Sequence, residues 1–319
     1  MIDPAQQLVT VFGGGGFIGR YVCEILLQRG ARVRVACREP RHANFIQPLG
    51  GVGQVGFVRA DLTLPASVVY AVAGASAVIN LVGILKGRFH GVQVEGARTA
   101  AEAARRAGSQ AFVQVSAIGA DVASESAYGR SKGEGEAAVR AAFPAATIIR
   151  PSLVFGPEDA LTNRLAGLAR LPLLPVIAAQ RKFQPVFVRD LAQAIATAAL
   201  DPETYGGGTY EIGGPQVMSF RELHEAILSA SGQHAELVDL PDFAGSLLSR
   251  FGFLPGAPLT RDQWLMLQRD NVAAPGAPGL DAFGIEPTPF AAVAPGWLGR
   301  FAGSRFGRRG SDTTDATAA

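Results

Sequence analysis

The chain has 319 residues, of which 48% are hydrophobic and 18% are charged, so it can bury a core large enough for one α/β domain and a smaller lobe. A formal net charge of +2 without clusters of lysine and arginine argues against a nucleic-acid surface. The two cysteines, Cys23 and Cys37, belong to no Cys/His cluster, so we expect no metal site and a reducing compartment.

The chain also offers no segment that reads as a membrane span. Its first residues show no basic stretch followed by an apolar one, so no secretory signal is expected. The uncharged run 62–85 is interrupted by Pro65, Gly74 and Asn80, which indicates a helix followed by a strand rather than a transmembrane helix. These features predict a cytoplasmic protein.

Short apolar runs alternate with helical stretches through the first half of the chain. The expected strands are 8–12, 33–36, 56–58, 78–82, 111–115 and 147–149. The expected helices between them are 18–29, 67–73, 92–107 and 131–142. Uncharged strands that alternate with helices indicate a parallel sheet covered on both faces, which is a doubly wound, Rossmann-type α/β fold.

The alternation stops near residue 157, which indicates a second part of the molecule. We expect residues 1–158 to form the dinucleotide-binding domain, with later sheet strands near 183–215, at 184–190 and 209–213. A smaller, mainly C-terminal lobe for a substrate or partner would consist of 159–182 and 216–302, followed by a disordered tail at 303–319.

Two apolar stretches of this lobe, 171–177 and 243–254, bear on what it binds. An active enzyme needs polar groups where the lobe meets the catalytic residues, whereas these stretches are apolar. For 243–254 we predict lobe core rather than a surface for a membrane or a partner, because apolar stripes at helical spacing usually face the interior.

A run of glycines lies between the first strand and the first helix. Glycine permits a sharp turn and close approach of the backbone to a pyrophosphate, and the N–H groups of the following helix attract phosphate. The run fits both G-x-G-x-x-G and G-x-x-G-x-x-G, so it predicts a dinucleotide without choosing the spacing. The expected cofactor contacts here are Gly13, Gly15, Gly16, Phe17, Ile18 and Gly19.

Arg38 stands at the end of the second strand, where an NAD-selective site places an acidic residue. A guanidinium at this position can grip a 2′-phosphate, with Arg41 and His42 close by in the chain, so the sequence predicts NADP(H) rather than NAD(H). Asp61 and Leu62 follow the third strand and are expected to frame the adenine, with helix capping as the alternative for the aspartate.

Tyr128 and Lys132 form a Y-x-x-x-K pair, one helical turn apart on the same face. A lysine beside the phenol is expected to lower the tyrosine pKa, and the same ammonium can hold the nicotinamide ribose. Tyrosine would then pass a proton while the cofactor passes a hydride. The pentapeptide is a weak signal alone and a strong one behind a glycine-rich βα turn.

Together with residues 150–157, R-P-S-L-V-F-G-P, these motifs resemble the extended and atypical short-chain dehydrogenase/reductase superfamily, which includes the nucleotide-sugar epimerases. The resemblance spans nearly the whole chain. It implies that Pro151 and Val154 lie against the nicotinamide. It also implies that Val82, Gly83 and Ser116 flank the cofactor from neighbouring strand ends.

A narrower resemblance concerns the NAD(P)H-binding accessory subunit family of respiratory complex I (NADH:ubiquinone oxidoreductase) and its bacterial relatives. It rests on residues 78–83, 143–144, 155–159, 259–263 and 284–289. It implies tight NADPH binding that supports complex I assembly and stability without electron transfer. The protein would then contact complex I subunits peripherally, on the inner face of the cytoplasmic or inner mitochondrial-type membrane.

One departure from the reductase pattern concerns the hydroxyl groups after the fifth strand. Extended reductases carry a Ser/Thr cluster there, whereas this chain has only Ser116 in S-A-I-G. If Ser116 contacts the cofactor, a substrate carbonyl lacks its polarising partner unless Ser124 or Ser126 replaces it. Tyr128 and Lys132 would then be vestigial.

These observations favour a structural or assembly accessory protein of the complex I type that binds NADP(H) with little or no turnover. The alternative is an active NADP-dependent reductase or nucleotide-sugar epimerase/dehydratase, acting on a small-molecule carbonyl or a nucleotide sugar through Tyr128, Lys132 and Ser116. A third hypothesis is a regulator that senses NADP(H) occupancy without chemistry.

Overall fold

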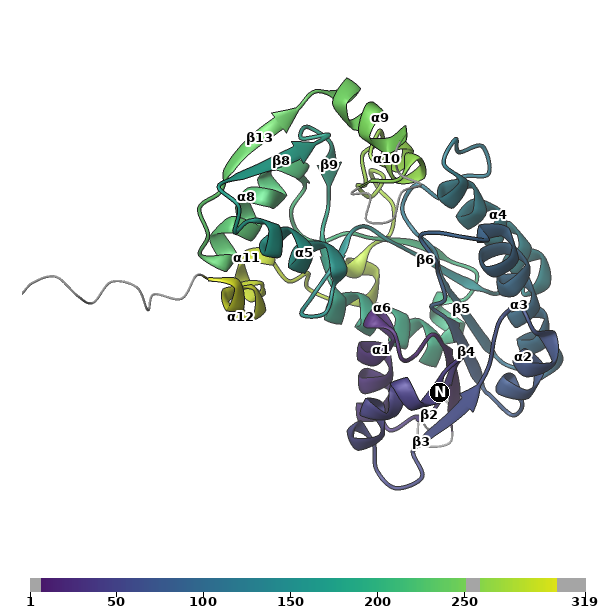
Figure 1. Ribbon diagram of the computed structural model, residues 1–319. Coiled ribbons are helices and arrows are strands. Elements are labelled where there is room, and N and C mark those ends of the chain that lie inside the picture. The colour runs from purple at the N-terminus through teal and green to yellow at the C-terminus, as the bar shows by residue number, and fades with distance from the viewer. Residues whose placement is uncertain (1–6, 251–258, 303–319) are drawn as a thin grey trace, which may run out of the picture.

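The computed structural model describes residues 7–250 and 259–302, and a seven-stranded, wholly parallel sheet forms its centre (Figure 1). The strand order is β11-β6-β5-β4-β1-β2-β3. The strands are β1 (Leu8–Phe12), β2 (Arg32–Cys37), β3 (Val55–Arg59), β4 (Ala77–Asn80), β5 (Ala111–Val115), β6 (Thr147–Pro151) and β11 (Thr209–Ile212). The order reverses between β1 and β4, which creates the crevice where ligands bind in such sheets.

Helices cover both faces of the sheet, as the doubly wound prediction requires. One face carries α1 (Phe17–Gln28) and α6 (Val188–Leu200), and the other carries α2 (Pro65–Val72), α3 (Gly96–Arg106) and α4 (Ala127–Ala142). Alternation along β1 explains the two layers, because Val9 and Val11 pack on the α1 side while Phe12 packs on the α3 side. Short helices η2 (Pro40–Leu49), η3 (His90–Glu95) and α7 (Pro202–Tyr205) complete the connections.

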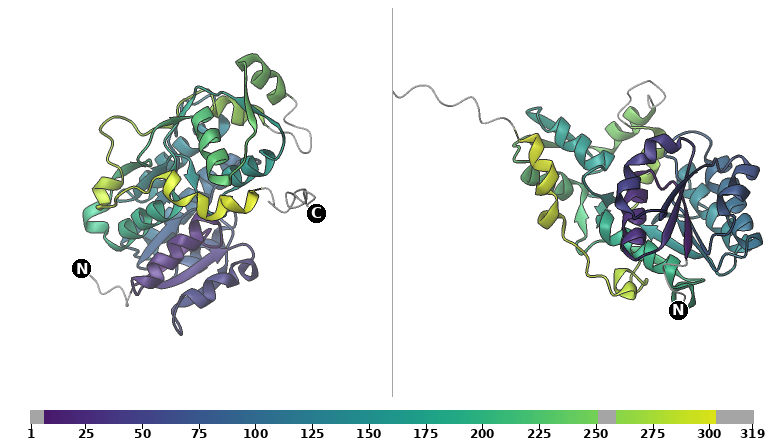
Figure 2. Two further views of the ribbon diagram at one scale, coloured as in Figure 1. Left: turned by 90° about the vertical axis from the view of Figure 1, so that its left-hand side faces the viewer. Right: turned by 90° about the horizontal axis from the view of Figure 1, so that it is seen from below.

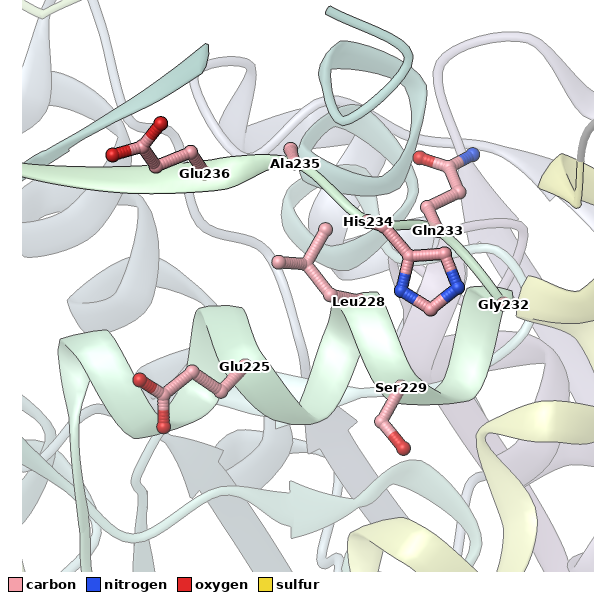
Figure 3. Close-up of a pocket in the computed structure, with 8 residues that line it drawn as sticks. All are labelled: Glu225, Leu228, Ser229, Gly232, Gln233, His234, Ala235 and Glu236. Carbon is pink, nitrogen blue, oxygen red and sulfur yellow. The ribbon is translucent and has the colours of Figure 1, made fainter. Parts of the chain in front are cut away.

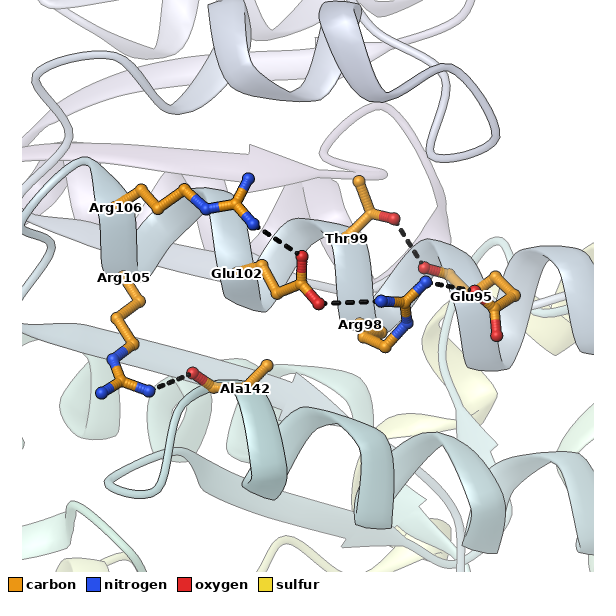
Figure 4. Close-up of polar contacts among 7 residues, drawn as sticks. All are labelled: Glu95, Arg98, Thr99, Glu102, Arg105, Arg106 and Ala142. Carbon is orange, nitrogen blue, oxygen red and sulfur yellow. Dashed lines mark hydrogen bonds and ion pairs between the residues drawn. The ribbon is translucent and has the colours of Figure 1, made fainter.

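Helix α3 shows how the outer layer is held. Its exposed face carries a ladder in which Arg98 bridges to Glu102 at 2.8 Å and Arg106 reaches Glu102 at 3.1 Å (Figure 4). Exposed pairs of this kind contribute little to stability. The opposite face is buried alanine, including Ala100 and Ala104, so small side chains let the helix lie close to the sheet.

A smaller lobe lies beside the sheet, as Figures 1 and 2 show. Its core is a cluster of aromatic and aliphatic side chains that includes Phe155, Phe183, Phe220 and Phe290. Its helices are α5 (Ala160–Leu168), α8 (Phe220–Ser231), α9 (Asp242–Arg250), α10 (Arg261–Met266), α11 (Phe290–Val293), α12 (Pro295–Leu298) and η5 (Gly299–Phe301). Contrary to the expected lobe range 216–302, η4 (Leu280–Phe283) packs against α6 in the core of the sheet domain. Its strands are β8 (Leu173–Ile177), β9 (Lys182–Phe183), β12 (Met218–Ser219) and β13 (Glu236–Leu240).

The later strands differ from expectation in one place. Residues 209–213 do extend the main sheet, because β11 pairs with β6. Residues 184–190 do not: β10 (Val186–Phe187) pairs with β7 (Val154–Phe155) in a separate two-stranded sheet. The physical reason is that β5 and β11 already occupy both edges of β6.

The expected burial of 243–254 is wrong for residues 243–250. Helix α9 exposes Phe243 by 74% and Leu247 by 54%. It packs through small residues instead, since Gly245 lies so close to Trp264 and Ile177 that a Cβ would clash with them. Residues 251–254, and the tail expected at 303–319, lie outside the described residues. Within the described ranges, no helix combines the length and apolar character that crossing a membrane requires.

Candidate functional site

The glycine turn lies at the carboxyl end of β1, beside the reversal of strand order. Gly13 adopts φ +78°, in the left-handed region, and donates its N–H to the Ala36 carbonyl at 3.0 Å. Gly16 is the N-cap of α1. A Cβ on Gly19 would clash with the backbone carbonyls of Gly13 and Gly14, so helix and turn approach too closely for any side chain there. Gly13 and Gly19, the first and last glycines of the G-x-x-G-x-x-G spacing, are thus among the positions that need glycine.

The other expected residues of the turn pack around it. Gly15 lies against Ala43 of η2, where an added Cβ would sit 2.9 Å from the Ala43 Cβ. Phe17 is half-buried, and its ring lies near Gly156 at the start of the lobe. Ile18 is half-buried against the core under α1. The start of α1 therefore touches both parts of the molecule.

Arg38 is exposed directly after β2, and the structure brings it near Asp61. The Asp61 carboxylate accepts hydrogen bonds from the Thr63 N–H at 2.9 Å and the Thr63 hydroxyl at 2.7 Å. These bonds, and to a smaller extent Arg38, hold the pKa of Asp61 below its usual value. Asp61 therefore stabilises the turn before α2, a role close to the helix capping given above as its alternative. Leu62 is buried against Gly96.

The ends of β4, β5 and β6 line up with the glycine turn. A Cβ on Gly13 would lie 3.4 Å from Val82, and one on Gly83 would lie 3.4 Å from the Lys132 Nζ. Ser116 is buried after β5. Pro151 ends β6 and is buried, and Val154 is half-buried in β7. Val82 and Gly83, which follow β4, thus lie between the glycine turn and Lys132.

Tyr128 and Lys132 lie in the first part of α4, which begins four residues earlier than the expected helix. The Lys132 Nζ donates to the Val115 carbonyl at 3.2 Å and lies 5.8 Å from the centre of the Tyr128 ring. Burial lowers the pKa of Lys132 to about 8, opposed by the nearby Glu136 carboxylate. Burial also raises the pKa of Tyr128 to about 12, so the predicted lowering of the tyrosine pKa is wrong.

Asp262, in the first turn of α10, contacts the N-terminus of α4 from the other lobe. Its carboxylate accepts from the Ala127 N–H at 2.6 Å and from the Tyr128 N–H and the Ser126 hydroxyl, each at 3.1 Å. A carboxylate at a helix N-terminus satisfies free N–H groups and complements the helix dipole. Sequence reasoning missed this role, because only the T-x-x-Q capping box around Asp262 was visible and not its distant partner.

Two side-chain amides complete the site and carried no signal in the sequence. Gln93 donates from Nε2 to the Ser131 hydroxyl at 2.7 Å, and Ser131 in turn donates to the Tyr128 carbonyl at 2.8 Å. Asn271 accepts from the Ser152 hydroxyl at 2.8 Å. Among the described residues, the buried Gln93 Oε1 and Ser116 Oγ have no hydrogen-bond partner. Buried polar atoms of this kind need one.

A cavity of about 610 Å³ lies between the sheet and the lobe, with Tyr128 in its wall. Ser124 and Ser126 also line it, although Ser126 already caps α4. The rest of the lining is largely apolar, and residues 171–177 contribute to it as the sequence indicated. Its volume is in the range of small-molecule sites.

A second hollow, of about 630 Å³, lies at the C-terminal end of α8 and is shown in Figure 3. Glu225, on α8, and Glu236, on β13, are both on the left of this view, and His234 is on the right. Glu225 is paired with Arg221 at 3.1 Å. The residues that line this hollow include neither the glycine turn nor the Tyr128/Lys132 pair, so the candidate site is the cavity beside Tyr128.

A glycine turn at the strand reversal, a Tyr/Lys pair on the helix after the fifth strand and a lobe beside them define an extended short-chain dehydrogenase/reductase. A solved structure with this fold is the NADPH-dependent quinone oxidoreductase of Escherichia coli complexed with NADPH. It superimposes with a TM-score of 0.73 at 19% identity, covering 90% of this chain and 98% of that one. At this identity the likeness shows the fold.

Sequence comparisons give the family. Residues 9–213 match the NAD dependent epimerase/dehydratase family, and the chain belongs to it. NADH dehydrogenase [ubiquinone] 1 alpha subcomplex subunit 9 of Rattus norvegicus is 34% identical over 291 residues, covering 88% of this chain and 77% of that protein. The ceramide reductase of Caulobacter vibrioides is 34% identical over 269 residues, covering 81% and 82%. Both resemblances stated from the sequence are confirmed.

Proposed function

We propose that the protein is an NADP(H)-dependent reductase that acts on the carbonyl group of an apolar substrate. The observation that carries this proposal is the position of Tyr128. It lines a cavity of small-molecule size, and Lys132 lies one helical turn behind it. A proton donor thus faces a space that a substrate can fill.

A nicotinamide dinucleotide fits the residues present. The unpartnered Ser116 Oγ and Gln93 Oε1 offer hydrogen bonds beside Lys132, and the glycine turn offers backbone N–H groups to phosphates. Arg38 is exposed and forms no hydrogen bond or ion pair within the described residues, although it acts electrostatically on Asp61, so its guanidinium can bind a 2′-phosphate. The proposed cofactor contacts are Gly13, Gly15, Gly16, Phe17, Ile18, Gly19, Arg38, Asp61, Leu62, Val82, Gly83, Ser116, Tyr128, Lys132, Pro151 and Val154.

The cofactor, when bound, supplies the hydride that converts the carbonyl carbon to that of an alcohol, and the chain supplies the proton. Because burial raises the pKa of Tyr128 to about 12, the phenol stays protonated near neutral pH and can donate to the developing alkoxide. Lys132 would hold the ribose hydroxyls. Ser116 is absent from the cavity lining, so Ser124, which lines it, would donate its hydroxyl hydrogen to the carbonyl oxygen. One carbonyl, one NADPH and one proton give one alcohol and one NADP⁺.

The relative named ceramide reductase supports a reductase function, because it matches over four-fifths of this chain, including the segments that carry Ser116, Tyr128 and Lys132. The largely apolar lining of the cavity favours reduction of an apolar carbonyl compound over epimerisation of a nucleotide sugar.

The second candidate is the accessory role that the sequence favoured. It is supported by the similarity to the complex I subunit of Rattus norvegicus over 88% of this chain. In this role the protein would hold NADP(H) without turnover and contact complex I subunits at the inner face of the cytoplasmic membrane. Its cofactor contacts would be the same as those of the reductase.

One experiment separates the two candidates. The purified protein is denatured, the released nucleotide is identified, and oxidation of NADPH is followed with 2-butanone and 2-tetradecanone. A reductase oxidises NADPH only when a ketone is present, and Tyr128→Phe loses this activity by about 1,000-fold while NADPH affinity stays within about twofold. Stoichiometric NADPH that no ketone oxidises, in a protein that copurifies with complex I, would establish the accessory role instead.

A further inference from the structure

The cavity beside Tyr128 differs from its rim in polarity. Its charged lining residues are Glu125, Arg164, Arg269 and Asp270, and all four are exposed. The inner wall is built from aliphatic and aromatic side chains of α5, β8, β9 and α8, among them Leu165, Leu174, Phe183 and Phe220. A diphosphate or a sugar would lose its water in such an interior without gaining partners, whereas an aliphatic chain would gain by burial.

Three apolar residues of the cavity lining are also exposed at the protein surface. Leu168, Leu171 and Met266 line the cavity and are also exposed by 40%, 55% and 36%. An alkyl chain that contacts these residues could continue along the apolar lining. The lining comes both from α4, which covers the sheet, and from α8 in the smaller lobe, and the volume of about 610 Å³ is in the range of small-molecule sites.

His224, on α8, is a polar residue in the largely apolar inner wall. It is 2% exposed, and its Nδ1 lies 2.7 Å from the Phe220 carbonyl of its own helix. Burial lowers the pKa of His224, so the ring is neutral and Nδ1 donates to that carbonyl. Nε2 is then an acceptor that has no partner within the described ranges. The wall also holds the Gln268 Nε2, a buried donor without a partner among the described residues.

We propose that this cavity binds the aliphatic chain of a lipid, and that the His224 Nε2 accepts a hydrogen bond from a hydroxyl or amide N–H which the lipid carries. A hydroxyl or an amide of the lipid can also accept a hydrogen bond through its oxygen, and the Gln268 Nε2 can donate that bond. That the lipid carries a reducible carbonyl group rests on the proposed reductase function. Binding of the lipid does not require turnover.

Chain length tests the apolar part of the site. The kcat/KM for 2-butanone, 2-octanone and 2-tetradecanone is expected to rise by about fourfold for each methylene group until the cavity is filled. Leu165→Trp fills part of the inner wall, so it should reduce kcat/KM for 2-tetradecanone by about tenfold or more and leave 2-butanone within about twofold. Equal kcat/KM values for the three ketones would overturn the chain site.

Matched lipids test His224 by calorimetry, with no reaction involved. N-methyltetradecanamide carries an N–H group, and methyl tetradecanoate of the same length does not. The protein with NADPH is expected to bind the amide about tenfold more tightly than the ester, and His224→Phe should abolish this preference. His224→Gln, whose amide oxygen can accept in place of Nε2, should restore it. Unchanged NADPH affinity shows that each variant is folded.

The outcomes separate this inference from the proposed function. A preference for the amide that survives in His224→Phe would overturn the role of His224. Long-chain binding with the expected preference, but without oxidation of NADPH by any ketone, would support the lipid site and contradict the reductase. Reduction of all three ketones at equal rates would support the reductase and contradict the lipid site.

Discussion

The two walls of the cavity are built in different ways. On the sheet side, the groups proposed to contact the cofactor are backbone turns and a few polar side chains at the ends of β1, β4, β5 and β6. On the lobe side, short helices and two-stranded sheets present mostly apolar side chains. From this difference we expect the sheet side to determine the reaction and the lobe side to determine which substrate binds.

The largest effect is expected from the buried lysine on the sheet side. Lys132→Met keeps the shape of the side chain and removes its ammonium, so kcat/KM for a ketone should fall by about 100- to 1,000-fold. Because a buried cation is removed, the melting temperature at neutral pH should stay the same or rise. A variant that melts far earlier would show that Lys132 is mainly structural.

Lys132 should also make the stability and the activity of the protein depend on pH. Its folded pKa of about 8 lies below the ordinary lysine value, so the folded protein binds fewer protons than the unfolded chain above pH 8. The free energy of unfolding should therefore gain a contribution that grows as pH rises from about 8 toward the ordinary lysine range. Over the same window activity should decline as the ammonium loses its proton. Lys132→Met should remove this contribution, which thermal unfolding across pH would measure.

The glycine turn gives the next largest effect. Gly19→Ala places a Cβ against the Gly13 and Gly14 carbonyls, so the turn must shift. We expect NADPH affinity to fall by about 100-fold, because a displaced turn loses several backbone hydrogen bonds to phosphate. Gly56→Ala in β3 is the matched control, since nothing lies within 4 Å of its added Cβ. Equal losses of affinity in both variants would contradict the role of the turn.

A smaller effect is expected at the exposed end of β2. Arg38→Asp should weaken NADPH binding by about 10- to 100-fold, the range of a lost charged hydrogen bond to phosphate, and should change NADH binding much less. Fluorescence titration with both nucleotides measures the ratio. If both affinities fall equally, the 2′-phosphate is not read by Arg38.

The smallest effect is expected from Asp262, a lobe residue that contacts α4 on the sheet side of the cavity. Asp262→Asn keeps the shape and removes the charge that faces the N-terminus of α4. We expect a loss of about tenfold in kcat, an unchanged affinity for NADPH and a destabilisation of about 1 kcal/mol. Asp201→Asn is the control, because Asp201 caps the short α7 with one bond to Thr204 and does not line the cavity. Equal effects of the two substitutions on kcat would mean that Asp262 does not position Tyr128.

The sheet was largely predictable from the sequence, because local patterns determine it. The bounds of β1 and β5 agree with expectation, since each apolar run is closed by glycine or serine. The strand expected at 78–82 ends earlier, at Asn80, because the Asn80 side chain accepts the Val82 N–H at 3.1 Å and turns the chain toward the cofactor edge. Apolar character alone could not reveal that turn.

The lobe was less predictable, because contacts between distant residues arrange it. Asp262 and Tyr128 lie 134 residues apart, and no local pattern connects them. Helix α9 misled the expectation because the face that it buries carries Gly245 and Ser249 rather than its large apolar residues. The pKa of Tyr128 was misjudged because burial raises it, and the spacing of residues in the sequence does not report burial.

The carboxylate of Asp262 has a consequence for how proteins built on this plan diverge. Because it is the contact through which α10 holds the first turn of α4, a descendant can replace the apolar wall residues and so exchange one substrate for another, provided that this carboxylate is kept. In the proposed reductase, loss of the carboxylate would slow the reaction by about tenfold, as given above, and leave the nucleotide bound. A single substitution at Asp262 can therefore lower turnover in such a protein without removing its cofactor.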